Sequence, residues 1–144
     1  KGKVNWSDTV TEMYLKRIQH YWKTTEQTLK IASKGDVPKK RWQESQQILN
    51  RLGQQDRLIV LDERGESFSS EQFASAIETA MMNGTKRLVF AIGGPFGHDP
   101  ALRQRAWKTL SLSSMVLNHE IARVILAEQL YRAATIIHGG QYHH

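Results

Sequence analysis

The sequence predicts a single α/β domain in which a mostly parallel sheet carries helices on both faces. The chain has 144 residues, of which 40% are hydrophobic, so it is long enough for one core and has the composition to fill it. Residues 57–62 and 87–92 are short, continuously apolar strands, and residues 69–82 between them have the spacing of an amphipathic helix. A helix between two strands that lack a polar face is typical of parallel strands covered on both sides.

Apolar spacing and capping residues predict the other elements. Four more helices are expected, at residues 8–21, 39–52, 100–107 and 118–137. Ser7 or Asp8 is expected to cap the first of these helices, and Asn118 the last. Weaker patterns predict strands at residues 24–31 and 109–113, and a turn at residues 63–66.

The helix expected at residues 118–137 is apolar on nearly every side. A helix without a polar face is buried by its own domain and by something else, so we expect a dimer. Glu128 and Arg132 stand four residues apart in the order that favours an ion pair. Arg123 has no acid four residues before it, although Glu120 lies three before it, and is therefore the better candidate for a functional charge.

Positive charge is concentrated in the first part of the chain. The net charge is +6, and residues 1–57 carry 12 basic and 6 acidic side chains, whereas residues 58–144 carry 8 of each. The densest run, residues 34–41, ends in Lys39, Lys40 and Arg41 and is followed by Trp42. This excess indicates either a polyanionic partner or simply a solvated face.

Several classes of function lack their sequence signals. Without cysteine the chain has no disulfide or thiolate metal site, and its histidines show no ligand spacing on one helix face, so we expect no metal. No G-x-S-x-G motif supports a serine hydrolase. No apolar run is long enough for a membrane span, and the N-terminal residues do not resemble a signal peptide.

Chemically capable residues follow three of the expected strands. They are Leu61 and Asp62, the glycine-rich residues 93–97, and residues 112–115, which include Ser113 and Ser114. Ligands of open α/β sheets bind at the carboxyl ends of the strands, so these segments are expected to converge on a ligand. The glycine-rich segment is neither a P-loop nor a dinucleotide fingerprint, and a tight turn is the alternative interpretation.

Taken together, these segments resemble a known family. Residues 88–97, 110–115 and 128–133, with the terminal Tyr142-His143-His144, are similar to the RlmH family of large-subunit rRNA pseudouridine N3-methyltransferases in the SPOUT (α/β-knot) superfamily. The resemblance is strong over residues 58–144 and weaker over residues 3–53. Family members begin with a strand that ends in a Gly-Lys pair, which Gly2-Lys3 resembles.

The resemblance implies one SPOUT domain over residues 1–144, with a basic part at 1–57 and a cofactor-binding part at 58–144 that forms a deep trefoil knot. It also implies a homodimer and S-adenosylmethionine bound in the knot. The positions that match the family's cofactor ligands are Leu61, Gly93, Leu112, Ser113, Ser114, Met115, Val116 and Leu117.

The implied reaction methylates N3 of a pseudouridine in large-subunit rRNA, on the assembled ribosome and in the cytoplasm, with an organellar location left open. His143 is expected to assist removal of the imide proton and Tyr142 to contact the base, with His144 as an alternative to His143. Arg123 and His119 are expected to steady the developing charge or a phosphate, and Lys39, Lys40 and Arg41 to bind rRNA. Two alternatives are a catalytically inactive RNA-binding protein of this fold and a SPOUT methyltransferase that acts on tRNA.

Overall fold

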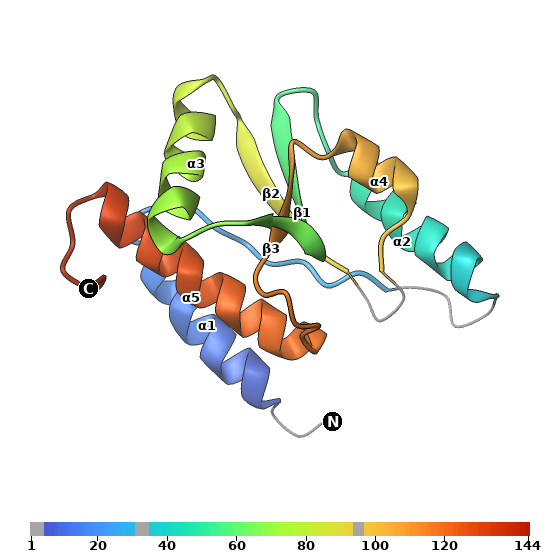
Figure 1. Ribbon diagram of the computed structural model, residues 1–144, viewed down its shortest axis with the longest axis horizontal. Helices are drawn as coiled ribbons and strands as arrows, with labels where there is room; N and C mark the ends of the chain where they lie inside the picture. Colours follow the sequence, from blue (N-terminus) through green and yellow to red (C-terminus); the bar gives the residue numbers. More distant parts are fainter. Residues whose placement is uncertain (1–4, 31–34, 94–96) are drawn as a thin grey trace.

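The protein is built around a three-stranded parallel sheet in the order β2-β1-β3 (Figure 1). A computed structural model describes residues 5–30, 35–93 and 97–144. Within these residues the strands are β1 (Asp56–Ser67), β2 (Arg87–Ile92) and β3 (Lys108–Ser111). Both neighbours pair with β1 in parallel, which confirms the predicted α/β class with a mostly parallel sheet.

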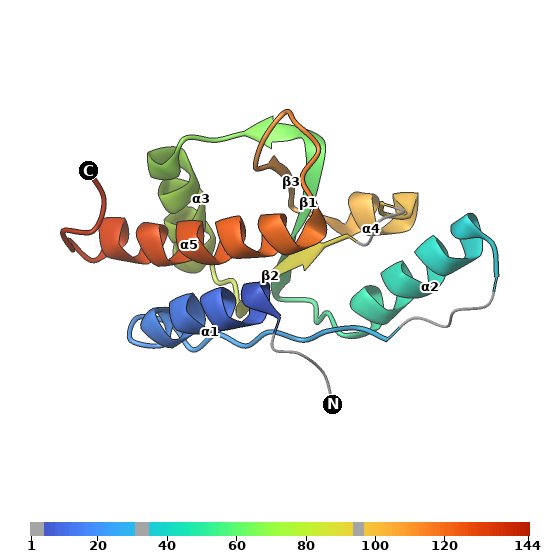
Figure 2. The same cartoon turned by 90° about the horizontal axis from the view of Figure 1, so that it is seen from below.

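Both faces of the sheet are covered by helices, as predicted (Figure 2). Ile59 and Leu61 of β1 point to one face and pack in a cluster with residues of α3 (Ser70–Met82) and α5 (His119–Ile137). Leu58 and Val60 point to the other face, where α2 (Val37–Asn50) and α4 (Pro100–Arg105) cover them. Because side chains alternate along a strand, the unbroken apolar run of β1 is what a strand buried on both faces requires.

The helix α1 (Trp6–Ile18) runs side by side with α5 outside the α3–α5 layer (Figures 1 and 2). The ring of Tyr131 lies 6.2 Å from that of Tyr14, and the guanidinium of Arg17 lies 5.6 Å from the Tyr131 ring. Asn5, not Ser7 or Asp8, caps α1 by accepting a hydrogen bond from the Ser7 amide. The predicted cap is wrong because Ser7 is fully buried inside the first turn.

Helix α5 is covered by α1 on one side and by α3 on another, so only part of its apolar surface remains for a further partner. Its cap, Asn118, is the predicted one and accepts a hydrogen bond from the Glu120 amide. Ser69 caps α3 in a capping box with Gln72, which confirms the predicted start of that helix. No helix in the described part of the chain is both long enough and apolar enough to cross a membrane.

Two predicted elements differ from the structure. Residues 24–30, the described part of the expected strand at 24–31, form no strand, since an extended segment needs a hydrogen-bonded neighbour to form a ladder. Residues 63–66 are not a turn but belong to the long strand β1. There the pairing with β3 slips, so that Leu61 and Glu66 both lie opposite Leu110. The intervening residues bulge out of the ladder, and β1 resumes its pairing beyond them.

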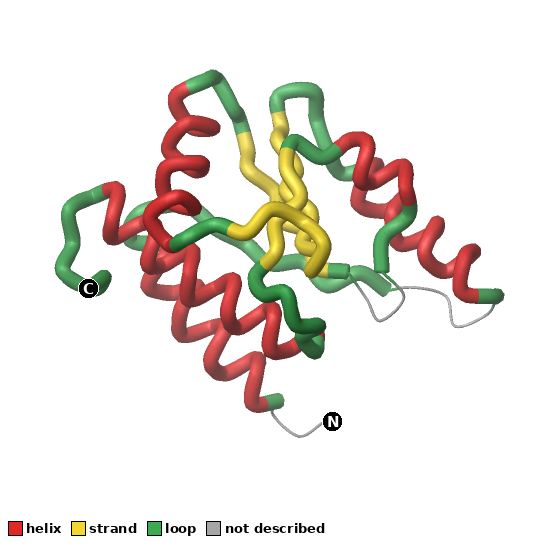
Figure 3. The backbone as a smooth tube through the Cα atoms, in the orientation of Figure 1, coloured by secondary structure: helices red, strands yellow, loops and turns green. Residues whose placement is uncertain are grey.

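The bounds of three other elements, which Figure 3 marks by colour along the backbone, also differ from those predicted. The helix expected at residues 100–107 ends at Arg105, because the Trp107 amide donates to the Leu58 carbonyl at 2.7 Å and draws the chain into the sheet. The strand expected at 109–113 accordingly occupies Lys108–Ser111. Helix α2 begins at Val37, two residues early, because Asp36 caps it by accepting from the Lys39 amide.

A close approach of two backbones explains the glycine at position 65. A Cβ atom placed on Gly65 meets the Thr109 carbonyl oxygen at 2.5 Å, a distance that neither backbone can accommodate without shifting. The bulge in β1 and its renewed pairing with β3 therefore need a residue without a side chain here.

We predict that Gly65→Ala lowers the free energy of unfolding by about 1–3 kcal/mol, the range expected for forced overpacking. Gly53→Ala is the matched control, because a Cβ atom at position 53 meets nothing closer than 3.6 Å. Urea denaturation of the two variants measures the difference. Equal stability of both variants would show that β1 and β3 do not meet at Gly65.

Candidate ligand site at the carboxyl edge of the sheet

The carboxyl ends of β2 and β3 lie on either side of Leu61 of β1, so the three segments meet as the sequence predicts, although β1 itself continues to Ser67. Leu61 is opposite Ile92 of β2 and opposite Leu110 of β3. Gly93 directly follows β2, and Leu112 follows the last residue of β3. The backbone groups of these positions therefore share one edge of the sheet, where a ligand can contact all of them.

His98 joins two of these strand ends. No role was predicted for it from the sequence beyond that of a histidine without metal-ligand spacing. Its Nε2 lies 3.1 Å from the Leu61 carbonyl oxygen, so that nitrogen carries the proton and donates it. A Cβ atom on Gly93 meets His98 Nε2 at 2.8 Å. Gly93 is thus needed for the ring to lie across the strand end, and the ring in turn ties the start of the glycine-rich segment to β1.

The second nitrogen of His98 is an acceptor without a partner. His98 is only 4% exposed, and its Nδ1 has no hydrogen bond among the described residues. Burial lowers the pKa of His98, against the opposing effects of the Leu61 carbonyl, Glu44 and Asp62. Arg103 adds to the lowering. The imidazole is therefore held neutral at the strand end and offers a buried acceptor there.

Asp62 is fixed at the same edge by two arginines. Arg64 donates to it through the backbone amide at 2.9 Å and through the side chain, and Arg103 donates at 2.7 Å. The hydrogen bond from the Arg64 side chain lowers the pKa of Asp62, while partial burial opposes this and Arg103 adds to it. Asp62 is consequently an ionised anchor whose oxygens are already engaged.

The segment after β3 is a tight local turn with exposed apolar side chains. Ser111 Oγ donates to the Ser113 carbonyl at 2.8 Å, and Ser113 Oγ accepts from the Met115 amide at 3.0 Å. These two serines therefore act as turn residues. Met115 and Val116 are 77% and 78% exposed. Ser114 is also exposed, whereas Leu112 and Leu117 are half-buried.

A groove of about 1020 Å³ lies beside this edge. It runs between α1, residues 22–29, β2 and α5, and its lining includes Gly93, His119 and Arg123. Leu61 and residues 112–117 are not part of its lining. Gly93 thus stands between two regions, the strand-end site with Leu61 and Leu112, and the groove with His119 and Arg123.

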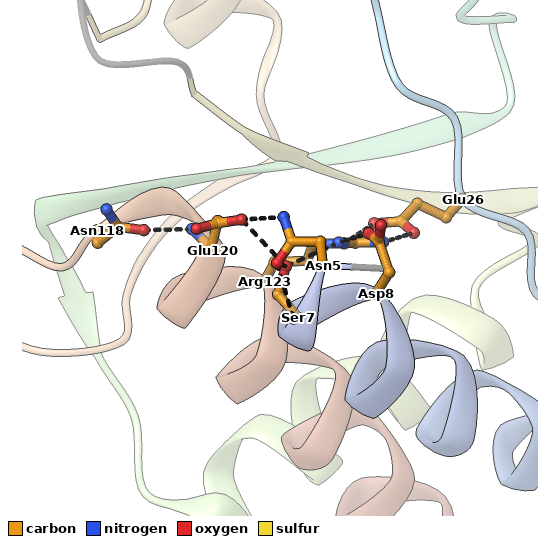
Figure 4. A network of polar contacts seen from close by, with 7 residues as sticks. All are labelled: Asn5, Ser7, Asp8, Glu26, Asn118, Glu120 and Arg123. Carbon is orange, nitrogen blue, oxygen red and sulfur yellow. Dashed lines mark hydrogen bonds and ion pairs between the residues drawn. The ribbon is translucent and has the colours of Figure 1, made fainter. Parts of the chain in front are cut away.

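Arg123 is bound by two carboxylates (Figure 4). Its Nε and Nη2 donate to the two oxygens of Glu26 at 2.6 and 2.7 Å, and its Nη1 donates to Asp8 at 2.5 Å. The hydrogen bonds that Arg123 donates to Glu26 raise the pKa of Arg123, with a further contribution from the one to Asp8, so the guanidinium stays charged. Arg123 therefore joins the start of α1 and the segment after it to α5. His119, four residues earlier, is exposed.

A second pair of contacts closes this network at the helix starts (Figure 4). Asn5 donates to Glu120, and Ser7 Oγ lies 3.3 Å from both Glu120 and Arg123. Glu120 is also the residue whose amide is capped by Asn118. The amino ends of α1 and α5 are thereby held together by side chains from both helices.

The chain end folds back onto the carboxyl end of α5. Tyr142 donates to Glu128 Oε2 at 2.8 Å, and Arg132 donates to the same oxygen at 2.6 Å. Arg132 also donates to His143 Nδ1 at 3.0 Å. His143 Nε2 lies 2.8 Å from Glu71 of α3. Burial and the contact with Glu128 raise the pKa of Tyr142. Hydrogen bonds from Arg132 and Tyr142 lower the pKa of Glu128 although burial opposes them.

The four predicted catalytic residues therefore form two groups rather than one. Arg123 and His119 lie in the first turns of α5, near the strand ends, and Tyr142 and His143 lie beyond its last turn. A helix of 19 residues is about 28 Å long, so the two groups are far apart within one chain. Figure 2 shows the C-terminus at the end of α5 remote from the β3–α5 connection.

The predicted RNA-binding residues lie at the start of α2, away from both groups (Figure 1). Lys39 is exposed, Lys40 and Arg41 are half-buried, and Trp42 is 52% exposed. The glycine-rich segment beyond Gly93, residues 94–96, and the Gly2-Lys3 pair lie outside the described residues. Across the residues that are described, no three His, Asp or Glu side chains gather as a metal site would need.

The fold and its edge define a class of protein: an α/β domain whose ligand loops follow the carboxyl ends of parallel strands. A family model described as "Predicted SPOUT methyltransferase" matches residues 1–143. The chain is 39% identical to a protein of Geotalea daltonii over 144 residues, which is 100% of this chain and 94% of that relative. It is 46% identical to a Brucella anthropi protein over 123 residues (80% and 77% of the two chains). It is 37% identical to a Porphyromonas gingivalis protein over 137 residues (93% and 87%).

Each of these three relatives is named ribosomal RNA large subunit methyltransferase H. The chain belongs to the SPOUT methyltransferase family, in the group whose members carry that name. This confirms the resemblance found in the sequence.

We predict that His98 makes the stability of the protein fall in mild acid. Its pKa is lowered in the folded state from an ordinary value of 6.5, so the unfolded chain takes up the proton first. The stabilisation is fully present above pH 6.5 and is lost as the pH falls through the folded-state pKa, by up to about 1.4 kcal/mol per pH unit. Urea denaturation between pH 7.5 and about pH 5 measures this.

His98→Gln, which keeps an N–H donor for the Leu61 carbonyl but does not titrate, is expected to flatten this pH dependence. The exposed His20→Gln is the matched control and is expected to leave it unchanged. If His98→Gln retained the full slope, the acid sensitivity would arise elsewhere.

We predict a stronger energetic coupling of Arg123 with Glu26 than with Asp8. The Glu26 contact is bidentate and its side chain is 32% exposed, whereas Asp8 is 48% exposed and makes one contact. A double-mutant cycle with Arg123→Met and Glu26→Gln should give about 1 kcal/mol, and the cycle with Asp8→Asn less than half of that. Equal coupling in both cycles would contradict the tie between α5 and the segment after α1.

Proposed function

We propose that this protein transfers a methyl group from S-adenosylmethionine to N3 of a pseudouridine in large-subunit rRNA, on the assembled ribosome in the cytoplasm. The observation that carries the proposal is the meeting of Leu61, Gly93 and Leu112 at one edge of the sheet in a chain of the SPOUT family. The names of the three relatives support rRNA as the substrate.

The strand ends fit an adenosine-containing ligand. Gly93 carries no side chain of its own after β2, and Leu112 and Leu117, which follow β3, are half-buried apolar side chains suited to enclose a base. His98 adds a buried acceptor that has no partner within the described residues. When bound, the cofactor supplies a methyl group on a positively charged sulfur. The proposed contacts are Leu61, Gly93, Leu112, Ser113, Ser114, Met115, Val116 and Leu117.

In this proposal the catalytic residues at the chain end, Tyr142 and His143, act at the strand ends of a second copy of the chain. Tyr142 and His143 lie at the far end of α5 from their own strand ends, and a homodimer that places them on the partner's strand ends removes this separation. Exposed apolar side chains support such an interface. Trp6 of α1, Ile121 of α5, Met115 and Val116 are between 43% and 78% exposed and belong to the segments at which α1 and α5 begin.

The protein's part in the reaction is positioning and proton removal. The imide N3–H of pseudouridine must lose its proton before or during methyl transfer, and a neutral imidazole such as that of His143 can accept it. Tyr142 is suited to stack on the base or donate to it. Arg123 and His119 line the groove together with Gly93. They are proposed to steady the deprotonated imide or a neighbouring phosphate, with Arg123 exchanging part of its contact with Glu26 or Asp8 for that group.

Lys39, Lys40 and Arg41 at the start of α2 are proposed to contact rRNA phosphates, with the exposed Trp42 beside them. We propose that the segment between β2 and α5 forms the deep trefoil knot of SPOUT proteins. This segment contains the glycine-rich residues and the chain after β3.

Methylation of ribosomes tests the function directly. The protein and S-adenosylmethionine are incubated in parallel with ribosomes that lack the modification, with protein-free rRNA and with tRNA, and the nucleosides are analysed by mass spectrometry. We expect 3-methylpseudouridine from ribosomes. Methylation of tRNA alone would favour the tRNA alternative, and RNA binding without any methylation would favour the inactive RNA-binding protein.

We predict that His143→Gln lowers the rate of methyl transfer by about 10²-fold or more, the usual contribution of a general base. His144→Gln is the matched control, since it removes the neighbouring imidazole and is expected to change the rate much less. S-adenosylmethionine affinity, measured by calorimetry, should be the same in both variants because the chain end is proposed to act on the pseudouridine and neither histidine is among the proposed cofactor contacts. A full rate in His143→Gln, or a loss in His144→Gln alone, would reassign the proton to another group.

A further inference from the structure

The sheet brings together basic side chains that are scattered in the sequence. All three strands begin at the same edge, opposite the strand-end site, and Figure 1 shows the segments that lead into β1, β2 and β3 gathered there. These segments carry six basic residues, which we call the amino-edge cluster: Arg51, Arg57, Lys86, Arg87, Arg105 and Lys108.

The segment from Arg51 to Arg57 is the centre of this cluster. Arg87 donates to the Arg51 carbonyl at 2.6 Å, and Arg105 donates to the carbonyls of Gly53 and Asp56 at 3.0 and 2.9 Å. The Lys86 amide donates to the Gln55 carbonyl at 2.9 Å. Residues 86–87 and Arg105, from two other stretches of the chain, are therefore fixed around one short segment.

The aromatic ring of Trp107 joins the remaining two cations. The Arg57 guanidinium lies 4.7 Å from the ring centroid of Trp107, and the Lys108 ammonium lies 5.0 Å from it. Both are attracted to the π-face, so two like charges are held close together by a neutral group. Trp107, Arg57 and Lys108 are half-buried and remain partly open to solvent.

Most of the contacts within the cluster fix the positive charges without neutralising them. Arg105 donates to backbone carbonyls, and the guanidinium of Arg57 lies over an aromatic ring. Within the described residues, the carboxylates in ion pairs with the cluster are Asp56, which pairs with Arg87 at 2.7 Å, and Glu66, which lies 3.8 Å from Lys108. Six cations thus face two carboxylates, one of which is buried.

Three arginines elsewhere in the described chain contrast with this pattern. Arg123 is bound by Glu26 and Asp8, Arg103 by Asp62, and Arg132 by Glu128. Those three arginines form ion pairs, whereas the amino-edge cluster keeps most of its charge.

We propose that the amino-edge cluster binds the phosphate backbone of rRNA, as a second RNA contact separate from Lys39, Lys40 and Arg41. Arginine forks and lysines that are fixed in place but not neutralised are the groups that bind successive phosphates, and Trp107 between two cations offers a surface to a sugar or an unpaired base. An extended polyanion matches a cluster that spans all three strand starts better than a single small anion does.

The location of the cluster gives the contact a definite role. Strands rise about 3.3 Å per residue, so β2, with 6 residues, separates the amino edge from the strand-end site by about 20 Å. The cluster therefore contacts RNA remote from the methylated nucleotide and contributes to docking on the ribosome. This inference rests on the proposed function for its choice of rRNA, but its test reads binding and not methylation.

Sedimentation over a range of KCl concentrations tests the proposal. It measures how strongly the protein binds large ribosomal subunits and protein-free large-subunit rRNA. Lys86→Gln/Lys108→Gln removes two charges from the cluster, and Arg57→Gln/Lys86→Gln is a second variant in case Lys108 supports the fold. The matched control, Lys16→Gln/Lys30→Gln, removes two exposed charges elsewhere. Lys39→Gln/Lys40→Gln measures the contribution of α2, and thermal melting with S-adenosylmethionine binding verifies that each variant is folded.

We expect both cluster variants to bind rRNA about 10-fold or more weakly near 0.1 M salt, with the slope of log K against log [salt] shallower by about 1.4–1.8, as for two lost phosphate contacts. The control pair should differ little from the unmodified protein. An unchanged slope in folded cluster variants, or an equal loss in the control, would overturn the proposal. Loss of binding to intact subunits but not to protein-free rRNA would also overturn it, in favour of an acidic protein partner. Absence of methylation with intact cluster-dependent binding would overturn only the proposed function.

Discussion

Parallel pairing of β1 with both of its neighbours is the constraint on which the rest of the structure depends. It covers both faces of the sheet with helices, because the connections between parallel strands must cross those faces. The two edges at which strands begin and end are then the places where connecting segments gather. Each edge collects residues from distant parts of the chain, and the chemistry of the two edges differs: backbone groups, glycine and a neutral imidazole at one, cations at the other.

Much of the fold could be predicted because local sequence and tertiary environment agree. The apolar run of β1 from Leu58 to Leu61 is buried on both sides, and Ser69 and Asn118 cap the helices that they were expected to cap. The predicted strand is not formed by residues 24–30, because an alternating pattern describes one face of a strand but supplies no neighbour to pair with. The turn predicted at residues 63–66 is wrong because a neighbouring strand is present there. Gly65 and its charged neighbours have turn composition, yet the backbone of Thr109 holds them extended.

The strand ends of the candidate site were predictable from topology alone, whereas the side chains around them were not. The rule that ligands lie beyond the carboxyl ends of strands located Leu61, Gly93 and Leu112 before any coordinates. His98 gave no such signal, because its importance lies in the Leu61 carbonyl that it reaches across the sheet. Arg123 was singled out because no acid lies four residues before it on its helix, and its partners, Glu26 and Asp8, come from elsewhere in the chain. The amino-edge cluster is likewise invisible to a count of charge along the sequence, since its members span residues 51–108.

The contacts that hold the chain end are of a kind that is easily exchanged. Glu128 retains its ion pair with Arg132, four residues along the same helix, whether or not Tyr142 donates to it. If Tyr142 and His143 move away, no buried charge is therefore left without a partner. Glu71 loses its contact with His143, but it is exposed, so water replaces the lost hydrogen bond. A segment bound in this way can leave its own subunit and bind a neighbouring one with little change in free energy. Where two chains associate, the geometry of their contact would then determine on which subunit each chain end lies.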